Sequence, residues 1–325
     1  MEGRETVSKR PNIVLIVADD MGYGDFGVFN DGPARTPHLD ALVDEGTCLA
    51  QHYAGSAACS PSRAALLTGR YPHRTGALTP MEMRGMDRIA LDEVTLGDTF
   101  KHAGYATGLI GKWHNGKGTL DRSFANGRAV YMGGMANHAD FAVQDLKDGE
   151  LGKERDAGGF SSTVFADEAI RYIQQAKGDK PFFLYVAFMA PHDPRNPPEK
   201  YRKMYYENRP PLPANYLPQH PFQNAPQATS GRDEGLAPWP RTREVISDQL
   251  CEYYGLVTHL DEQVGRIMKA LEGSSHADNT LVVYTADHGL GMGSHGLLGK
   301  QNVYEQSMQC PLILQGPGVP SGKSS

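Results

Sequence analysis

The sequence predicts an α/β fold in which a mostly parallel central sheet carries helices on both faces. Four apolar runs have the composition of strands buried on both faces of a parallel sheet; they cover residues 13–18, 106–110, 182–188 and 280–284. Four segments show helical periodicity or helix end signals; they cover residues 37–45, 96–102, 161–176 and 246–271. Strands that alternate with helices in this way are typical of parallel sheets.

Size and charge restrict the class of protein. The 325 residues suffice for one large α/β domain or for two smaller units. The 32 basic and 38 acidic residues give a net charge of −6, which argues against nucleic acid or an anionic membrane as the main partner. The four cysteines are widely spaced without a CxxC pattern, so they indicate neither a zinc ribbon nor a disulfide framework.

The N-terminal ten residues differ from the rest of the chain. Residues 1–10 are polar and lack an apolar core, which predicts a disordered or tag-like N-terminus without a signal peptide or membrane span. The main domain is expected over residues 11–325. The compartment stays open: the protein is periplasmic or secreted if an export signal has been removed from this sequence, and otherwise cytoplasmic.

The first apolar run, Ile13–Ala18, ends in two adjacent carboxylates, Asp19 and Asp20. Ligands of open α/β sheets gather beyond the carboxyl ends of the strands, so this pair favours a cation site. The alternative is that one carboxylate caps the following turn while the other is solvated.

Helix end signals define the elements that follow. Thr36 and Pro37 suit the N-cap and the first turn of a helix, and a short strand is expected near residues 47–53. A glycine, the residue type that most often ends helices, follows each predicted helix: Gly46, Gly69, Gly104, Gly178 and Gly273. The helix over 246–271 has a long apolar stripe, which predicts core packing.

Cys59 stands at the start of a short helix. Ser60 suits its N-cap and Pro61 its first turn, so the helix is expected to begin immediately after Cys59. Free N–H groups and a partial positive charge at a helix N-terminus favour an anion there, and Arg63 can reach back over the same spot. A cationic, donor-rich setting is typical of an anion-processing cysteine. The alternative is a buried, idle thiol.

Polar residues also follow the other three apolar runs. The run at 106–110 leads into Gly-Lys-Trp-His, with Lys112 and His114. The run at 182–188 leads to His192 between two prolines, and the run at 280–284 leads to Asp287 and His288. Carboxyl ends of parallel strands share one edge, so these side chains are expected to face one rim. Taken singly, a lysine and a histidine beyond a strand, such as Lys112 and His114, are more often ordinary surface residues.

Two stretches lack clear periodicity. Residues 115–160 are rich in glycine and polar residues and predict loops and short elements. Residues 191–240 hold twelve of the 22 prolines, which predicts a long irregular excursion. Such an excursion is typical of a lid or a substrate wall, and a plain surface connector is the alternative.

The string from Cys59 to Gly69, Cys-Ser-Pro-Ser-Arg-Ala-Ala-Leu-Leu-Thr-Gly, resembles the signature of type I sulfatases, in which the cysteine is converted after synthesis to formylglycine (3-oxoalanine). The Gly-Lys-Trp-His string is similar to a second family motif. The resemblance runs from Pro11 to about Pro320 and implies the alkaline phosphatase-like sulfatase fold. It also implies a C-terminal subdomain, which is expected to be missing from this sequence.

The resemblance implies a divalent metal. Its ligands in this sequence would be Asp19, Asp20, residue 59, Asp287 and His288. Hard oxygen ligands favour Ca²⁺, with Mg²⁺ as the alternative, over zinc. Many relatives carry asparagine where His288 stands, and an imidazole is a softer ligand than an amide oxygen.

Roles of the remaining residues follow from the same resemblance. Cys59, as the formylglycine hydrate, would supply one oxygen to attack sulfur and a second hydroxyl that later expels sulfate. Arg63 and Lys112 would hold the nucleophile and sulfate, and His114 would act as base in the elimination. His192 and Lys300 would assist the departing alcohol. His295, on a glycine-rich loop, would face the substrate or be solvated.

The predicted activity is hydrolysis of sulfate monoesters, more on sulfated sugars than on free aryl sulfates. The expected partners are a saccharide sulfate ester and a maturing enzyme, either a formylglycine-generating or an anaerobic sulfatase-maturing enzyme. Two alternatives remain: a phosphonate monoester or phosphodiester hydrolase of the same superfamily, and an inactive, anion-binding remnant.

Overall fold

The computed structural model describes residues 10–29, 31, 33–80, 85–86, 88–177, 180–222 and 231–324. The predicted N-terminal segment lies outside these ranges except for Arg10, and so does Gly178, the predicted end of one helix.

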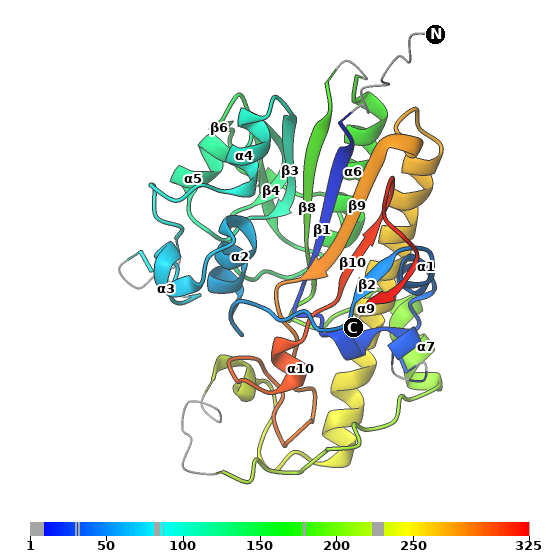
Figure 1. Ribbon diagram of the computed structural model, residues 1–325. Helices are drawn as coiled ribbons and strands as arrows, with labels where there is room; N and C mark the ends of the chain where they lie inside the picture. Colours follow the sequence, from blue (N-terminus) through cyan, green and yellow to red (C-terminus); the bar gives the residue numbers. More distant parts are fainter. Residues whose placement is uncertain are drawn as a thin grey trace.

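A parallel sheet forms the centre of the molecule (Figure 1). Its strands run side by side in the order β9 (Thr280–Ala286), β1 (Asn12–Asp19), β8 (Phe182–Pro191), β3 (Ala106–Lys112) and β4 (Asn126–Tyr131). Each neighbouring pair in this series is parallel. The four predicted apolar runs all lie in these strands, so the prediction of a mostly parallel sheet is confirmed.

Further strands extend the sheet on both sides, and their pairings are antiparallel except for that of β11 with β2, which is parallel. Beyond β9 lie β10 (Leu312–Gln315), β2 (Thr47–Leu49) and β11 (Gly322–Ser324), and beyond β4 lie β5 (Ala142–Lys147), β6 (Glu150–Leu151) and β7 (Arg155–Asp156). The prediction of loops and short elements for 115–160 missed β4 and β5. Their sequences carry polar residues at several positions because they lie toward one side of the sheet, so they show no long apolar run.

Helices cover both faces of the sheet, as predicted. One face carries α1 (Pro37–Glu45), α6 (Ser161–Gln175) and α9 (Arg243–Glu272), and the other carries α2 (Cys59–Thr68), α4 (Leu96–His102) and α5 (Lys117–Ser123) (Figure 1). Alternate residues of β1 enter the two cores. Val14 and Ile16 pack in the first core, and Leu15 and Val17 pack in the second.

The N-cap of helix α2 lies two residues earlier than predicted. The helix starts at Cys59, its N-cap is Ala58, and Ser60 lies inside the first turn. The prediction of Ser60 as N-cap is therefore wrong. The Ser60 hydroxyl instead donates to the carbonyl of His114 at 2.8 Å, a tertiary partner that sequence rules for caps do not anticipate. The helix ends at Gly69 as predicted, and this glycine has a φ of +66°.

The proline-rich excursion is less irregular than predicted. It contains α7 (Glu199–Glu207), which packs on α9, and a 3-10 turn, η3 (Arg232–Leu236). Tyr201 and Tyr205 are the buried residues of α7. Tyrosines among charged residues form no aliphatic stripe, which explains why the sequence pattern did not reveal this helix. No helix within the described ranges has both the length and the apolar character needed to cross a membrane.

Candidate active site

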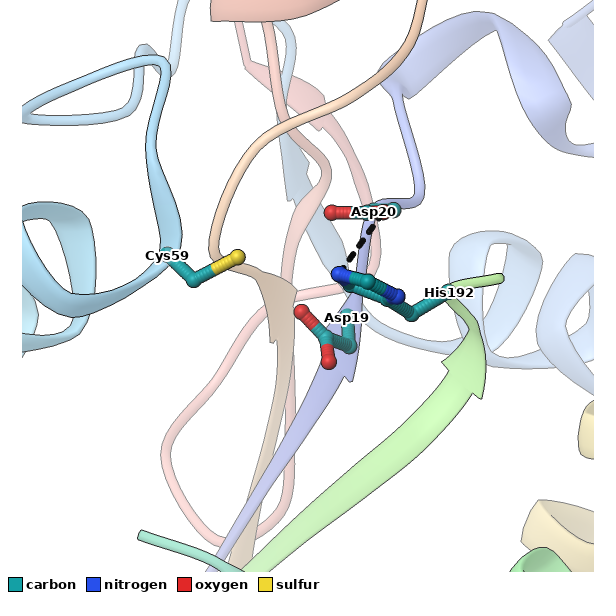
Figure 2. Close-up of side chains that lie close together, drawn as sticks. All are labelled: Asp19, Asp20, Cys59 and His192. Atoms are coloured by element: carbon teal, nitrogen blue, oxygen red, sulfur yellow. Dashed lines mark ion pairs between the residues drawn. The ribbon is translucent and has the colours of Figure 1, made fainter. Parts of the chain in front are cut away.

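Residues from several strand ends and one helix end meet at a single place. The candidate ligand atoms of Asp19, Asp20, Cys59 and His192 lie within 4.8 Å of one another, and those of Cys59, Asp287 and His288 form a second such group. Figure 2 shows the two aspartates at the end of β1, with Cys59 facing them from α2 and His192 approaching from the end of β8. All six residues are buried.

A backbone bend at Asp20 joins the ends of two neighbouring strands. Asp20 has a φ of +74°, a left-handed conformation uncommon for residues other than glycine. Its backbone N–H donates to Asp287 Oδ1 at 3.1 Å, which ties the end of β1 to the residue that follows β9. Uncommon backbone conformations cluster at functional sites, where surrounding contacts hold them.

Arg63 connects α2 to both strand ends. Its Nε lies 3.0 Å from Asp287 Oδ2 and its Nη2 lies 3.4 Å from Asp19 Oδ1. Burial by itself would lower the pKa of this guanidinium, but the charges of Asp287 and Asp19 outweigh burial and raise it. Arg63 is therefore a permanent positive charge inside the site.

Lys112 is the second buried cation. Its ammonium forms an ion pair with Asp19 Oδ2 and donates to the carbonyl of Gly134 at 2.6 Å. Burial would raise the pKa of Asp19, but the nearby charges of Lys112 and Arg63 hold it well below the ordinary value. Asp19 is thus a carboxylate, as a metal ligand must be.

Lys300 is the third cation, and it approaches residue 59 directly. Its Nζ lies 3.1 Å from Cys59 Sγ and 2.7 Å from Asp20 Oδ1. Burial opposes ionisation of the thiol, but Lys300 and Lys112 together keep the pKa of Cys59 well below its usual value. The position of residue 59 thus favours negative charge.

The donor set fits a divalent cation. Three atoms of the candidate ligands are among the buried atoms without a hydrogen-bond partner in the described part of the chain: Asp19 Oδ1, Asp20 Oδ2 and His288 Nε2. Buried polar atoms are rarely left without a partner, and an unseen ion is one ordinary explanation. The carboxylates supply hard oxygen ligands, and the imidazole is acceptable to several divalent metals.

His114 faces the pocket as a neutral imidazole. Burial and the adjacent Lys112 charge lower its pKa to about 3, so it carries no proton on one ring nitrogen at neutral pH. It has a φ of +56°, and its Nδ1 lacks a hydrogen-bond partner within the described part of the chain. A neutral imidazole with a free nitrogen has the form that a general base needs.

His192 directly follows β8 and is the more basic of the two histidines. Burial opposes its protonation, but the negative charge of Asp20, whose Oδ2 lies 3.7 Å from Nε2, raises the pKa of His192. Its Nδ1 lies 2.8 Å from the carbonyl oxygen of Asp193. The pKa values of the two histidines are therefore shifted in opposite directions, which suits one as a base and the other as an acid.

The pocket over residue 59 is large enough for a sugar-sized group. Its volume is about 570 Å³. Its lining combines Cys59, His114, His192 and Lys300 with glycines, methionines and three further cations, Arg88, Lys117 and Arg232. This mixture of apolar surface and positive charge suits an anionic ligand with an apolar or sugar portion.

His295 lies elsewhere. It is not among the residues that line this pocket. Its ring stacks on Tyr304 with 4.0 Å between centroids, and its Nε2 lies 3.1 Å from Asn215 Nδ2. The structure therefore brings Cys59, Arg63, Lys112, His114, His192 and Lys300 together with the candidate metal ligands but does not place His295 with them.

Sequence reasoning missed several charged neighbours. Asp20, Asp193 and Asp233 form a third group of close carboxylates, and Arg232 pairs with Asp193 at 2.6 and 2.8 Å. A signal for them did exist. Residues 232–234, Arg-Asp-Glu, are a cluster of charges inside the proline-rich stretch 210–240, which otherwise contains no Asp, Glu, Lys or Arg.

Comparisons with known proteins agree with this geometry. The sulfatase family model matches residues 11–325. The chain is 31% identical over 360 residues to human N-acetylgalactosamine-6-sulfatase, covering 99% of this chain and 60% of that protein. It is 29% identical over 322 residues to an ulvan-active sulfatase of Formosa agariphila, covering 97% of this chain and 58% of that protein.

One solved structure extends the comparison to the fold. Ps i-CgsB, solved in complex with k-i-k-neocarrahexaose, superposes with a TM-score of 0.72 at 26% identity, covering 97% of this chain and 68% of that chain. The chain spans about three fifths of the length of the curated relatives that it matches. The match of the family model over almost the whole sequence shows that the chain belongs to the sulfatase family.

Proposed function

We propose that this protein hydrolyses sulfate monoesters of carbohydrates. The observation that carries the proposal is the position of Cys59: it begins α2, contacts Lys300 and faces Asp19 and Asp20. Similarity to an N-acetylgalactosamine-6-sulfatase and an ulvan-active sulfatase, and to a structure solved with k-i-k-neocarrahexaose, supports a sugar as the alcohol portion.

The metal proposed for this site is Ca²⁺. Asp19, Asp20, Asp287, His288 and residue 59 would hold it. Ca²⁺ accepts irregular sets of six to eight oxygen ligands, whereas Mg²⁺ demands near-ideal octahedral geometry. Carboxylates that come from two different strand ends suit the more tolerant ion. A bound divalent cation would supply Lewis-acid stabilisation of the charge on the sulfate.

Cys59 is proposed to be converted to formylglycine by a formylglycine-generating or anaerobic sulfatase-maturing enzyme. The hydrated aldehyde provides one hydroxyl for attack on sulfur and a second for expulsion of sulfate. The chain's own residues then have separate tasks. Arg63 and Lys112 orient the sulfate, and His114, neutral at physiological pH, accepts a proton during expulsion of sulfate.

The departing alcohol is proposed to leave on the other side of the pocket. His192, whose raised pKa favours the protonated form, donates a proton to the ester oxygen. Lys300 lies between Cys59 and Asp20 and stabilises negative charge on the same oxygen. His192 and Lys300 thus assist departure of the alcohol, a step that sulfate binding alone does not explain.

A substrate panel tests the proposal. Protein with and without co-expressed maturing enzyme is assayed for turnover of p-nitrophenyl sulfate, phosphate, a phosphonate monoester and a phosphodiester, and for sulfate release from sulfated saccharides. We expect sulfate release only after maturation, with the residue 59 peptide modified by mass spectrometry. Faster turnover of phosphonates or phosphodiesters than of sulfates would support the alternative hydrolase. Modified protein that releases no sulfate would support an anion-binding remnant.

A further inference from the structure

A buried carboxylate outside the predicted site accepts hydrogen bonds from the loop that carries Lys300. Glu234, in η3, is 3% exposed. Its carboxylate accepts hydrogen bonds from the backbone N–H of Gly299 at 2.8 Å and from that of Leu298 at 3.1 and 3.2 Å. These are the two residues immediately before Lys300, so the carboxylate fixes the backbone from which the lysine side chain projects.

Arg241 holds Glu234 from the opposite side. Its Nη2 donates to Glu234 Oε2 and to the Glu234 carbonyl, both at 2.7 Å, and its guanidinium lies 3.9 Å from the ring centroid of Trp239. Arg241 is fully buried. Removing two charges from water is costly, and a buried ion pair often contributes little net stability compared with apolar residues. Stability alone is therefore a weak explanation for this arrangement.

Close packing at Gly299 shows how tightly η3 meets the loop. A Cβ atom at Gly299 would lie 2.5 Å from Asp233 Cβ and 3.1 Å from Glu234 Oε1. A glycine is needed for the loop backbone to approach the turn this closely. The lysine that follows then reaches Asp20 and Cys59 with its ammonium.

The same turn also contacts the histidine side of the pocket. Arg232 donates to both carboxylate oxygens of Asp193, the residue after His192. A bidentate arginine–carboxylate pair restricts the orientation of both groups. Arg232 and Glu234 thus contact the residues next to His192 and Lys300, the two groups proposed to assist the departing alcohol.

We propose that Glu234 is a positioning residue for departure of the alcohol, acting by fixing Lys300 over the ester oxygen. This inference rests on the proposed function. Without the carboxylate, the N–H groups of Leu298 and Gly299 lose their acceptor, and the Lys300 ammonium samples positions away from Cys59. Loss of this positioning lowers kcat/KM for substrates whose alcohol is a poor leaving group. It has little effect on kcat/KM for substrates whose alcohol leaves without assistance.

The leaving-group dependence of kcat/KM tests the proposal. The matured wild type and Glu234→Ala are compared on aryl sulfates whose phenols range from strongly to weakly acidic. For Glu234→Ala we expect kcat/KM to fall about 100-fold for the poorest leaving group and less than about 3-fold for the best. Glu234→Gln keeps one acceptor oxygen for the Gly299 N–H and is expected to fall between the two. Equal loss on every substrate would overturn the proposal.

Glu93→Gln is the matched control. Glu93 is also a buried carboxylate paired with an arginine, Arg70 at 3.4 Å, and neither residue contacts the pocket. We expect it to show no change in leaving-group dependence. If Glu93→Gln steepened that dependence as much as Glu234→Ala, the effect would be general loosening of the fold and the proposal would fail.

Chemical labelling separates this inference from the proposed function. Reductive methylation of the folded protein, read by mass spectrometry, is expected to modify Lys300 slowly in wild type and at least about 5-fold faster in Glu234→Ala, because the buried amine becomes accessible. Unchanged labelling would overturn the positioning role. A wild type that releases no sulfate would instead overturn the proposed function, while the labelling result would still report how Glu234 holds Lys300.

Discussion

Arg63 Nε lies 3.0 Å from Asp287 Oδ2, and neither side chain is exposed. This contact joins the helix that presents residue 59 to the strand end that presents a candidate metal ligand. Removing one member of a buried ion pair leaves the other charge without a partner, which typically costs about 3–5 kcal/mol of stability.

Replacement of Arg63 is therefore expected to make the free energy of unfolding depend more strongly on bound Ca²⁺. For Arg63→Met we expect the free energy of unfolding to fall by about 3–5 kcal/mol in chelator, with partial recovery in Ca²⁺ because the cation offsets the unpaired carboxylates. Urea unfolding with EDTA and with Ca²⁺ measures both values. A variant that Ca²⁺ does not stabilise more than wild type would contradict the expectation.

Metal removal should destabilise the wild type. Ca²⁺ at 100 times its dissociation constant is expected to add about 2.7 kcal/mol to the free energy of unfolding. Asp20→Asn should lose most of this increment, because it removes a buried ligand. Asp167→Asn, which affects only an exposed pair with Arg266, should keep it. Thermal unfolding over a Ca²⁺ titration measures the difference, and an equal response of both variants would argue against a metal at Asp20.

Gly134 leaves space that His114 occupies. A Cβ atom at Gly134 would lie 2.6 Å from His114 Cε1 and 2.7 Å from Nε2. Gly134→Ala is therefore expected to displace the imidazole and lower kcat by about 100-fold, the usual contribution of a general base. Gly235→Ala is the control, because nothing lies within 4 Å of its added methyl group. Steady-state kinetics decide, and similar kcat values for the two variants would count against His114 as base.

Asp261 makes stability depend on pH at a distance from the candidate active site. It lies on α9 and accepts hydrogen bonds from the backbone N–H of Leu39 at 2.7 Å and of His38 at 3.3 Å, at the start of α1. Burial raises the pKa of Asp261 to about 7, although these hydrogen bonds oppose the shift. The folded protein thus retains a proton that the unfolded chain releases near pH 4.

The sign of this effect follows from the raised pKa. Stability due to Asp261 should fall as pH rises from about 4 to about 7, by up to about 4 kcal/mol. For Asp261→Asn we expect this component of the decline to disappear. Asp44→Asn, an exposed carboxylate on α1, should leave the profile unchanged. Denaturant unfolding across this pH range measures the slopes, and a wild-type slope retained in Asp261→Asn would refute the assignment.

Local sequence signals were sufficient for the central elements. β1, β8 and β9 lie in the middle of the sheet, so each contains a continuous apolar run that identifies it without further information. β4 and α7 were not predicted, for two different reasons. β4 carries polar residues among its apolar ones, and α7 buries tyrosines on α9 in place of aliphatic side chains. Their structure depends on partners distant in sequence.

The site was predictable where a residue directly follows a strand or begins a helix. Asp20 and His192 could be placed at one rim because parallel strands end together. Glu234 could not, because its partners are backbone N–H groups 64 and 65 residues away, which no side-chain pattern encodes. Ser60 shows the same limit, since its hydroxyl serves the carbonyl of His114 and not its own helix.

The anchoring of η3 divides the cleft into two walls. One wall, formed by α2 and the ends of β1, β3 and β9, holds the groups proposed to bind the sulfate. The other wall, anchored by η3, holds the groups proposed to assist the departing alcohol. Because separate stretches of chain build these walls, mutation can reshape the alcohol side while leaving the sulfur side intact. An evolving protein of this architecture could thereby exchange one sugar for another without rebuilding its chemistry.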